Sequence, residues 1–223
     1  IKFLKLVGRA KSVVIGMIHV QVDWKLIVCC SFEQDGLIIE NMHDVLYTFS
    51  IGPEVCASMT AVCAAGRGIC PSLFRSCLQQ TALDVALGVD FIRAEGYVFS
   101  SVADEGLLNA CVGVLLRYGK QIKAEHVQIF TDIKKKHSSH VLTSDVSIVE
   151  TARADPVELR DVAESVRLLV LIGSGVTHDN MEQYLDSIAM TIGSHFKRGG
   201  VWAYAVDPES VKKFMGKVRF LRK

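Results

Sequence analysis

The chain has 223 residues, half of them hydrophobic, and its formal net charge at pH 7 is +1. This length is enough for one domain with a complete core and too short for two domains of ordinary size, so residues 1–223 are expected to form a single domain. The near-neutral charge gives no electrostatic reason to expect nucleic acid or an anionic membrane as a partner. Because the sequence contains no run of about eighteen apolar residues, a membrane span is not expected either.

The seven cysteines are an odd number without the spacing of a metal site. Cys56, Cys63, Cys70 and Cys77 recur every seven residues, and the first few are expected on one buried side of a helix as small core thiols. Free thiols indicate a reducing compartment, and we expect the cytoplasm. The mitochondrial matrix is the alternative, because a sequence that begins at Ile1 rather than Met is compatible with a removed targeting segment.

Strands and helices alternate in the first half of the chain. The apolar run at 12–20 predicts a buried strand that ends at His19, and 35–44 predicts a second strand with acidic and amide groups at its carboxyl end. A proline at a tolerated first-turn position opens a predicted helix over 52–65. Another helix is predicted over 79–87.

The same alternation continues in the second half and predicts an α/β fold with a parallel sheet. The predicted elements here are strands at 89–96 and 126–134, helices at 107–120, 143–154 and 156–165, and a final basic helix from Asp207 to Val218.

Two apolar runs, at 170–177 and 190–196, stop abruptly at Gly-Ser. Uninterrupted apolar residues are typical of a parallel strand buried on both faces. Glycine after such a strand permits a tight turn and leaves backbone N–H groups accessible, and parallel barrels often hold a phosphate at the loops after strands seven and eight. The alternative is a pair of plain tight turns. Because such a turn follows each of the last two predicted strands, we favour a phosphate site made of Gly173, Ser174, Gly175, Gly193 and Ser194.

The strand spacing predicts a (β/α)8 TIM barrel from which parts are absent. A barrel unit has about 31 residues, from roughly 250 residues in eight units. The predicted strand midpoints Ile38 and Ile92 are 54 residues apart, and Ile129 and Leu171 are 42 apart. Each interval fits two units without a visible strand between them. We therefore expect strands three and six, and part of the first loop, to be absent from the sequence.

Four segments together resemble a known family: Val14-Ile15-Gly16-Met17-Ile18-His19, Asp35-Gly36-Leu37-Ile38-Ile39-Glu40-Asn41, Phe91-Ile92-Arg93 and Val170-Leu171-Ile172-Gly173-Ser174-Gly175. They resemble the BtpA family over nearly the whole chain. The resemblance implies an aldolase-type barrel related to the ribulose-phosphate-binding barrels. It also implies a link to photosystem I accumulation in photosynthetic members, while members elsewhere have no settled activity. The family pattern has a Leu-Pro-rich loop after His19 and strands three and six, all of which this chain is expected to lack.

Polar side chains stand at the predicted carboxyl ends of the strands. These ends converge on one mouth in a parallel barrel, and unpaired buried charges are costly, so together they indicate a polar site. The set comprises His19, Glu40, Asn41, Arg93, Glu95, Asp132 and Lys134.

Several of these residues also have a plain structural interpretation. His19 fits a core histidine bonded to a carbonyl, and Glu40 with Arg93 fits a structural ion pair. Asp132 and Lys134 share one face of a strand, where a salt bridge is commoner than a lysine that acts as a base or Schiff-base donor.

Residues 104–109, including Asp104, Glu105 and Asn109, are expected to start a helix rather than bind substrate. No metal and no cofactor are expected, because adjacent acidic and histidine residues at 40–44 lack metal-ligand spacing.

The leading hypothesis is a barrel that binds a small phosphorylated metabolite at the Gly-Ser turns and acts as an isomerase or lyase. Glu40, Asp132 and Lys134 would supply acid–base chemistry, and Arg93 would neutralise the charge of the ligand. The rival is a non-catalytic assembly or stability factor for a protein complex, which exposed apolar surface on the outer helices would favour. A homo-oligomer is compatible with either hypothesis.

Overall fold

The computed structural model describes residues 12–20, 34–43, 52–69, 74–78, 89–97, 99–104, 106–132, 139, 171–185, 187 and 189–222. Its central element is a parallel sheet in the order β7-β4-β3-β2-β1-β9-β8. The strands are β1 (Val13–His19), β2 (Gly36–Glu40), β3 (Phe74–Leu78), β4 (Phe91–Ala94), β7 (Gln128–Thr131), β8 (Leu171–Gly173) and β9 (Ala189–Ile192).

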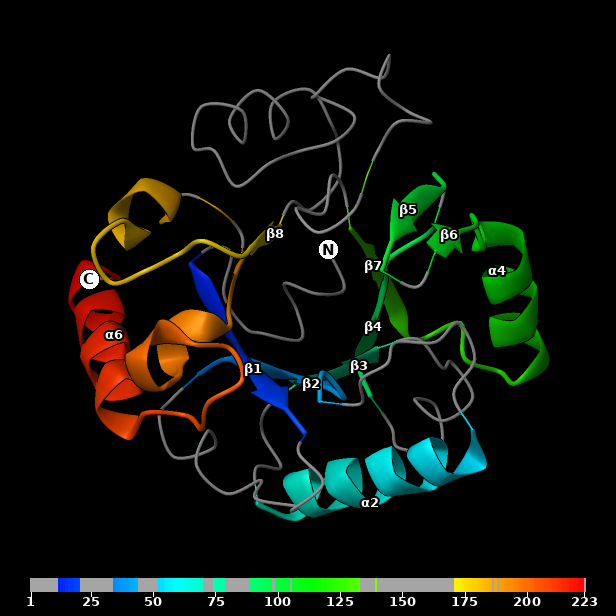
Figure 1. Ribbon diagram of the computed structural model, residues 1–223, viewed down its shortest axis with the longest axis horizontal. Helices are drawn as coiled ribbons and strands as arrows, with labels where there is room; N and C mark the ends of the chain where they lie inside the picture. The colour runs from blue at the N-terminus through cyan, green and yellow to red at the C-terminus, as the bar shows by residue number, and fades with distance from the viewer. Residues whose placement is uncertain are drawn as a thin grey trace.

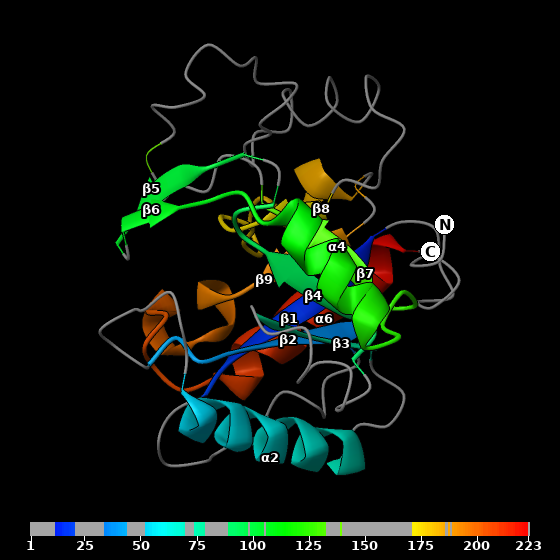
Figure 2. The ribbon, with the colours of Figure 1, turned by 90° about the vertical axis from the view of Figure 1, so that its right-hand side faces the viewer.

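Three α-helices lie outside the arc that the sheet follows: α2 (Pro53–Ile69), α4 (Val112–Gln121) and α6 (Pro208–Leu221) (Figure 1). Short 3-10 helices η4 (Met181–Tyr184), η5 (Ser194–Phe196) and η6 (Arg198–Gly200) flank β9 along the chain, and β5 (Ser101–Ala103) with β6 (Gly106–Leu108) forms an antiparallel hairpin. In Figure 2 the hairpin, η5 and η6 lie toward one end of the strands, and the carboxyl terminus lies toward the other end. The described part of the chain is therefore an α/β fold on a parallel sheet.

The side chains of the sheet form a core on each of its two faces, because neighbouring residues of a strand point to opposite sides. One face carries the cluster Val13, Ile15, Ile38, Phe91 and Ala189. The opposite face packs against helices, with Ile39 against α2 and Val14 against α6. β1 and β2 are thus buried on both faces, which explains their uninterrupted apolar sequences.

The final helix begins as the sequence predicts. The Asp207 side chain accepts a hydrogen bond from the Glu209 N–H, and Pro208 occupies the first turn, where its missing N–H is not needed. Val211, Phe214, Met215 and Val218 form the buried face of this helix. The predicted cap is confirmed, although the helix continues to Leu221.

The prediction that strand three is absent is wrong. β3 lies between β2 and β4, with Gly36 opposite Phe74 and Cys77 opposite Ile92. The sequence of this strand, FRSCL, contains an arginine and a serine, so it does not form the apolar run by which the other strands are recognised. The 54-residue interval between the predicted midpoints Ile38 and Ile92 thus contains a further strand, and Cys77 belongs to it.

The helix predicted from residue 107 also requires correction. Leu107 belongs to β6, Asp104 lies in the hairpin turn, and α4 starts only after Cys111. Two adjacent leucines fit a helical period as well as a short strand, which is why the pattern misplaces this boundary. The predicted absences of strand six and of part of the first loop, and the predicted helices at 79–87, 143–154 and 156–165, concern residues outside the described ones.

Asp35 and Arg222 connect the last turn of the chain to the amino-terminal ends of the first two strands. The Arg222 NH2 donates to Asp35 Oδ2 at 2.6 Å and also to the Ser12 carbonyl. The same carboxylate oxygen accepts the Val14 N–H at 2.8 Å. Since charge-assisted hydrogen bonds are stronger than neutral ones, this cluster anchors α6 to the sheet edge that lies opposite the polar strand ends.

Gln34 is a buried polar residue, 4% exposed, and neither of its amide atoms has a hydrogen-bond partner among the described residues. Its Oε1 lies 2.8 Å from the position that a Cβ on Gly16 would take, so a larger residue at position 16 would require the Gln34 side chain to move. Methionine has a similar shape without the polar atoms. We expect Gln34→Met to raise the free energy of unfolding by about 1–2 kcal/mol in urea denaturation, because it removes an unsatisfied buried amide. The control Gln34→Glu should lower it, and a loss on Gln34→Met would mean that the amide is paired in solution.

Candidate functional site

Arg93 links two carboxylates across the carboxyl ends of β2, β4 and β7. Its NH1 donates to Glu40 Oε1 at 2.7 Å. Its Nε and NH2 donate to the two carboxylate oxygens of Asp132 at 2.8 and 2.6 Å. This two-point geometry matches the planar fork of a guanidinium to a planar carboxylate. The ion pair between Glu40 and Arg93 that the sequence suggests is present, and Asp132 is a second partner.

Burial and charge act against each other in this cluster. Burial raises the pKa of Glu40, which is only 3% exposed, and the Arg93 charge only partly offsets that effect. For Arg93, burial lowers the pKa, but the hydrogen bonds and charge of Asp132, with the charges of Glu40 and Glu95, outweigh it and raise the pKa above its ordinary value. The guanidinium is therefore permanently charged, while Glu40 is the member of the cluster best able to accept a proton.

His19 at the end of β1 lies beside Glu40. Its Nδ1 donates to the Trp202 carbonyl at 3.1 Å, and its Nε2 is 3.8 Å from Glu40 Oε2. Burial and the charge of Lys197 lower the pKa of His19 to about 4. The imidazole is thus neutral near pH 7, and the contact with Glu40 is not an ion pair. With the proton on Nδ1, the unprotonated Nε2 is the ring nitrogen nearer to the Glu40 carboxyl group, but the 3.8 Å separation is too long for a hydrogen bond.

A cluster of aromatic rings covers this corner of the site. The rings of His43 and Trp202 have centroids 5.3 Å apart, and both contact the His19 ring. Burial and the charge of Lys197 also lower the pKa of His43. The loop after β9, which contributes Lys197 and Trp202, therefore closes one side of the mouth. The sequence does not single out Lys197, because one basic residue in a short loop has no periodic signal.

The two Gly-Ser corners lie at the same edge of the sheet, because β8 and β9 are paired in parallel with Gly173 opposite Thr191. Ser174 and Gly175 have φ values of 72° and 77°, a left-handed conformation that glycine adopts easily and serine seldom does. A Cβ added to Gly173 or Gly175 would meet no atom of the described residues within 4 Å. Among the described residues, the first corner therefore faces open space.

The second corner is closer to the middle of the sheet. A Cβ on Gly193 would lie 3.2 Å from Met17 Sδ, so this glycine packs beside β1. Ser194 then begins η5, and the first N–H groups of such a turn have no partner inside it.

Most of the predicted site residues are at these strand ends. Arg93 binds both Glu40 and Asp132, and His19 lies beside Glu40. Asn41 follows Glu40 directly in the chain. Glu95 lies close enough to influence the pKa of Glu40 and Arg93. Lys134 lies outside the described residues. No group of three histidine, cysteine, aspartate or glutamate side chains in the described ranges has the arrangement of a metal site.

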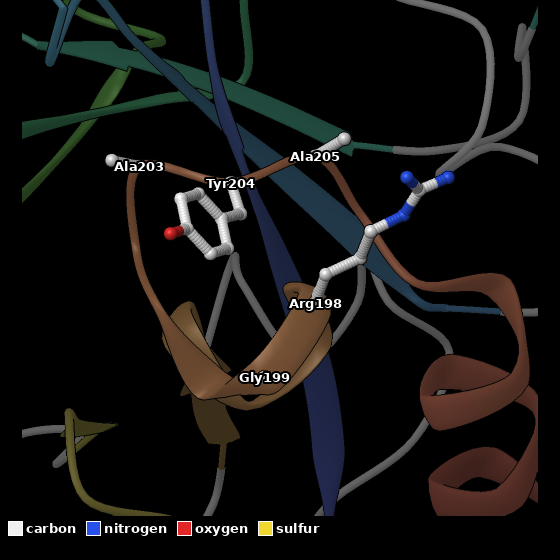
Figure 3. Close-up of a pocket in the computed structure, with 5 residues that line it drawn as sticks. All are labelled: Arg198, Gly199, Ala203, Tyr204 and Ala205. Atoms are coloured by element: carbon white, nitrogen blue, oxygen red, sulfur yellow. The ribbon is translucent and has the colours of Figure 1, made fainter.

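The loop after β9 also forms a shallow hollow of about 520 Å³, lined by Arg198, Gly199, Ala203, Tyr204 and Ala205 (Figure 3). The Arg198 guanidinium extends away from the Tyr204 ring rather than toward it. None of the predicted site residues lines this hollow, so it does not belong to the candidate site.

Comparison with known sequences identifies the family. The BtpA family model matches residues 30–154 and 146–219. The chain belongs to the BtpA family. This confirms the resemblance seen in the four sequence segments.

Curated relatives of this BtpA-family chain come from distant organisms. An uncharacterized mitochondrial protein of Caenorhabditis elegans is 36% identical over 270 positions, covering 98% of the chain and 97% of the relative. That alignment is longer than the chain itself, so the relative has internal residues without a counterpart here. The photosystem I biogenesis protein BtpA of Synechocystis is 26% identical, covering 81% of the chain and 72% of the relative.

Solved structures similar to this BtpA-family chain include TIM-barrel enzymes. The tryptophan synthase alpha chain of Legionella pneumophila has a TM-score of 0.59 at 10% identity, covering 98% of this chain and 95% of its own. The YdjI aldolase of Escherichia coli has a TM-score of 0.51 at 8% identity, covering 98% and 95%. At these identities the likeness concerns the fold alone. No helix among the described residues is long and apolar enough to cross a membrane.

Proposed function

We propose that this chain is a single (β/α)8 barrel domain over residues 1–223 that binds a small phosphorylated metabolite and rearranges or cleaves it by proton transfer, as an isomerase or lyase. The observation that carries the proposal is the position of two different groups at one edge of the sheet. Proton-transfer groups follow β1, β2 and β7, and glycine corners follow β8 and β9. A ligand that spans this edge would meet both.

The reacting end of the ligand would meet Glu40, whose pKa is raised by burial, as suits a group that takes up and releases a proton. Asp132 would hold the Arg93 guanidinium in place. Three of the five guanidinium N–H groups are used in the described contacts, and the other two would neutralise charge on the ligand. Lys134 stays in the proposal from the sequence alone, as a base. His19, Asn41 and Glu95 would complete the polar wall.

The anionic end would lie against Gly173, Ser174, Gly175, Gly193 and Ser194. Backbone N–H groups without a Cβ in front of them let an oxygen ligand approach closely. The open space at Gly173 and Gly175 supports this placement.

Thermal unfolding with inorganic phosphate and a set of sugar phosphates tests the proposal. A ligand at a hundred times its dissociation constant adds about 2.7 kcal/mol of stability, which raises Tm by roughly 5–11 °C for a domain of this size. Gly173→Leu should remove this shift, because its side chain would fill the open space without strain. The matched control is Gly119→Leu on α4, where a Cβ also meets nothing within 4 Å. A wild-type chain that shifts with none of these anions would contradict the proposal, and an unchanged shift in Gly173→Leu would place the anion elsewhere.

A second candidate, a non-catalytic assembly factor, is favoured by exposed apolar surface at α4 and the hairpin. Val114 and Leu116 on α4 are 75% and 51% exposed, and Leu107 on β6 is 49% exposed. Exposed apolar side chains of this size can mark protein contacts when they gather into a patch. The name of the Synechocystis relative agrees with such a role. This second candidate would be favoured if anions do not change the Tm of the wild type and the Gly173→Leu variant still binds a partner complex.

For location, we propose the cytoplasm or the mitochondrial matrix. The mitochondrial relative in Caenorhabditis elegans supports the matrix. Cell fractionation of the tagged full-length protein decides between them.

A further inference from the structure

The two Gly-Ser corners are connected by a side chain from the second one. His195, in η5 directly after Ser194, accepts a hydrogen bond at Nε2 from the His178 N–H at 3.1 Å. His178 belongs to the loop that follows β8. A bond of this kind requires an unprotonated Nε2 and therefore the tautomer with hydrogen on Nδ1.

The loop that His195 holds, residues 174–180, is otherwise restrained from within and from α6. Asn180 Oδ1 accepts the Thr177 N–H at 2.7 Å, and its Nδ2 donates to the Gly175 carbonyl at 2.9 Å. From α6, Lys217 Nζ donates to the His178 carbonyl at 2.9 Å. Both polar backbone groups of His178 are thus held by side chains of other elements, and the His195 imidazole, which accepts the N–H, is a group that can itself take up a proton.

The surroundings of His195 favour its neutral form. Its ring packs near Phe196 and Phe214, with centroids 6.4 and 5.7 Å away. Burial, then the charges of His178 and Lys213, lower its pKa, and the charge of Asp179 partly opposes them. The ring therefore accepts the His178 N–H throughout the neutral range.

We propose that His195 is a positioning residue that holds the β8 loop against the β9 corner for anion binding, and that a proton on Nε2 releases this loop and weakens the binding of anions. The inference rests on the proposed anion site and adds a pH-dependent regulation to it. An imidazolium cannot accept the His178 N–H, and its own Nε2–H would point at that donor. The loop would then keep only its internal bonds and the contact from Lys217.

The sign of the pH effect separates this role from a simple charge effect. A new positive charge beside the corners would by itself strengthen anion binding as the pH falls. Loss of the positioning bond weakens binding as the pH falls. The two roles therefore predict opposite slopes.

The test is a titration with sulfate, which keeps its charge between about pH 8 and pH 5.5, followed by calorimetry or thermal shift. His195→Gln places a carbonyl acceptor at a similar reach and does not titrate, and His195→Leu keeps apolar packing without an acceptor. At pH 8 we expect wild type and His195→Gln to bind sulfate alike and His195→Leu to bind about 2- to 10-fold more weakly, the cost of one hydrogen bond. As the pH falls and Nε2 takes up a proton, the wild type should weaken relative to His195→Gln, and the loss should approach a similar factor when His195 is fully protonated.

The outcomes distinguish the two levels of the proposal. If the wild type binds no sulfate at any pH, the anion site itself is wrong and this regulation with it. If the wild type binds sulfate and Gly173→Leu does not, the anion site stands. In that case, equal affinity of His195→Leu at pH 8, or a wild-type affinity that rises relative to His195→Gln at low pH, overturns the role of His195 alone.

Discussion

Replacing Arg93 by methionine is expected to lower the free energy of unfolding by about 3–5 kcal/mol, measured by urea denaturation at pH 7. The guanidinium makes three hydrogen bonds to Glu40 and Asp132. Their side chains are 4% and 18% exposed, so neither carboxylate can recover full hydration when the cation is removed. A buried charge that has lost its partner accounts for most of the expected loss.

The control for this prediction removes the charges together. In Arg93→Met combined with Glu40→Gln and Asp132→Asn, no uncompensated carboxylate remains, and most of the lost stability should return. A loss below about 1 kcal/mol in the single variant would put the cluster in the range of exposed ion pairs, and the site would then be well hydrated.

The second large effect is a pH dependence of stability that His19 produces. The unfolded chain protonates this residue at its ordinary pKa of 6.5, whereas the folded protein does so at about 4. The contribution of His19 is therefore fully present above pH 6.5 and is lost as the pH falls from about 6.5 to about 4. This difference corresponds to about 3 kcal/mol.

His19→Asn isolates this contribution, because the asparagine amide lies near the Nδ1 position, can still donate to the Trp202 carbonyl, and does not titrate. The difference in unfolding free energy between wild type and variant should be constant above pH 7 and should change by about 3 kcal/mol down to pH 4. His43 and His195 contribute with the same sign and Glu40 with the opposite sign, but they are common to both proteins. Parallel curves through the whole range would mean that His19 is hydrated in the folded state.

The sequence predicts the parallel sheet, most of its strands and the polar residues at their ends, because all of these depend on local patterns. β1 illustrates the reason: every residue from Val13 to Gly16 is buried, so the strand has an unbroken apolar sequence. The sequence pattern does not predict β3 or the hairpin of β5 and β6. Their short sequences carry no distinctive period, and only pairing with neighbouring strands defines them.

The candidate site is predictable as a set of residues but not as a set of contacts. The order of strands in a parallel sheet brings Glu40, Arg93 and Asp132 to one edge, so their types and positions are readable from the sequence. The roles of Trp202 and His195 are not readable, because they depend on a backbone carbonyl and a backbone N–H that any residue could supply.

The contact between Asp35 and Arg222 lies at the opposite ends of the strands from Glu40 and Arg93, so the two ends can tolerate different substitutions. The strands are anchored at their amino-terminal ends, and their carboxyl-terminal ends carry the groups that would react. Substitutions at the second set of positions therefore need not disturb the first. A lineage of such proteins can exchange its reactive groups, or lose them and keep only a docking role, while the same scaffold continues to fold.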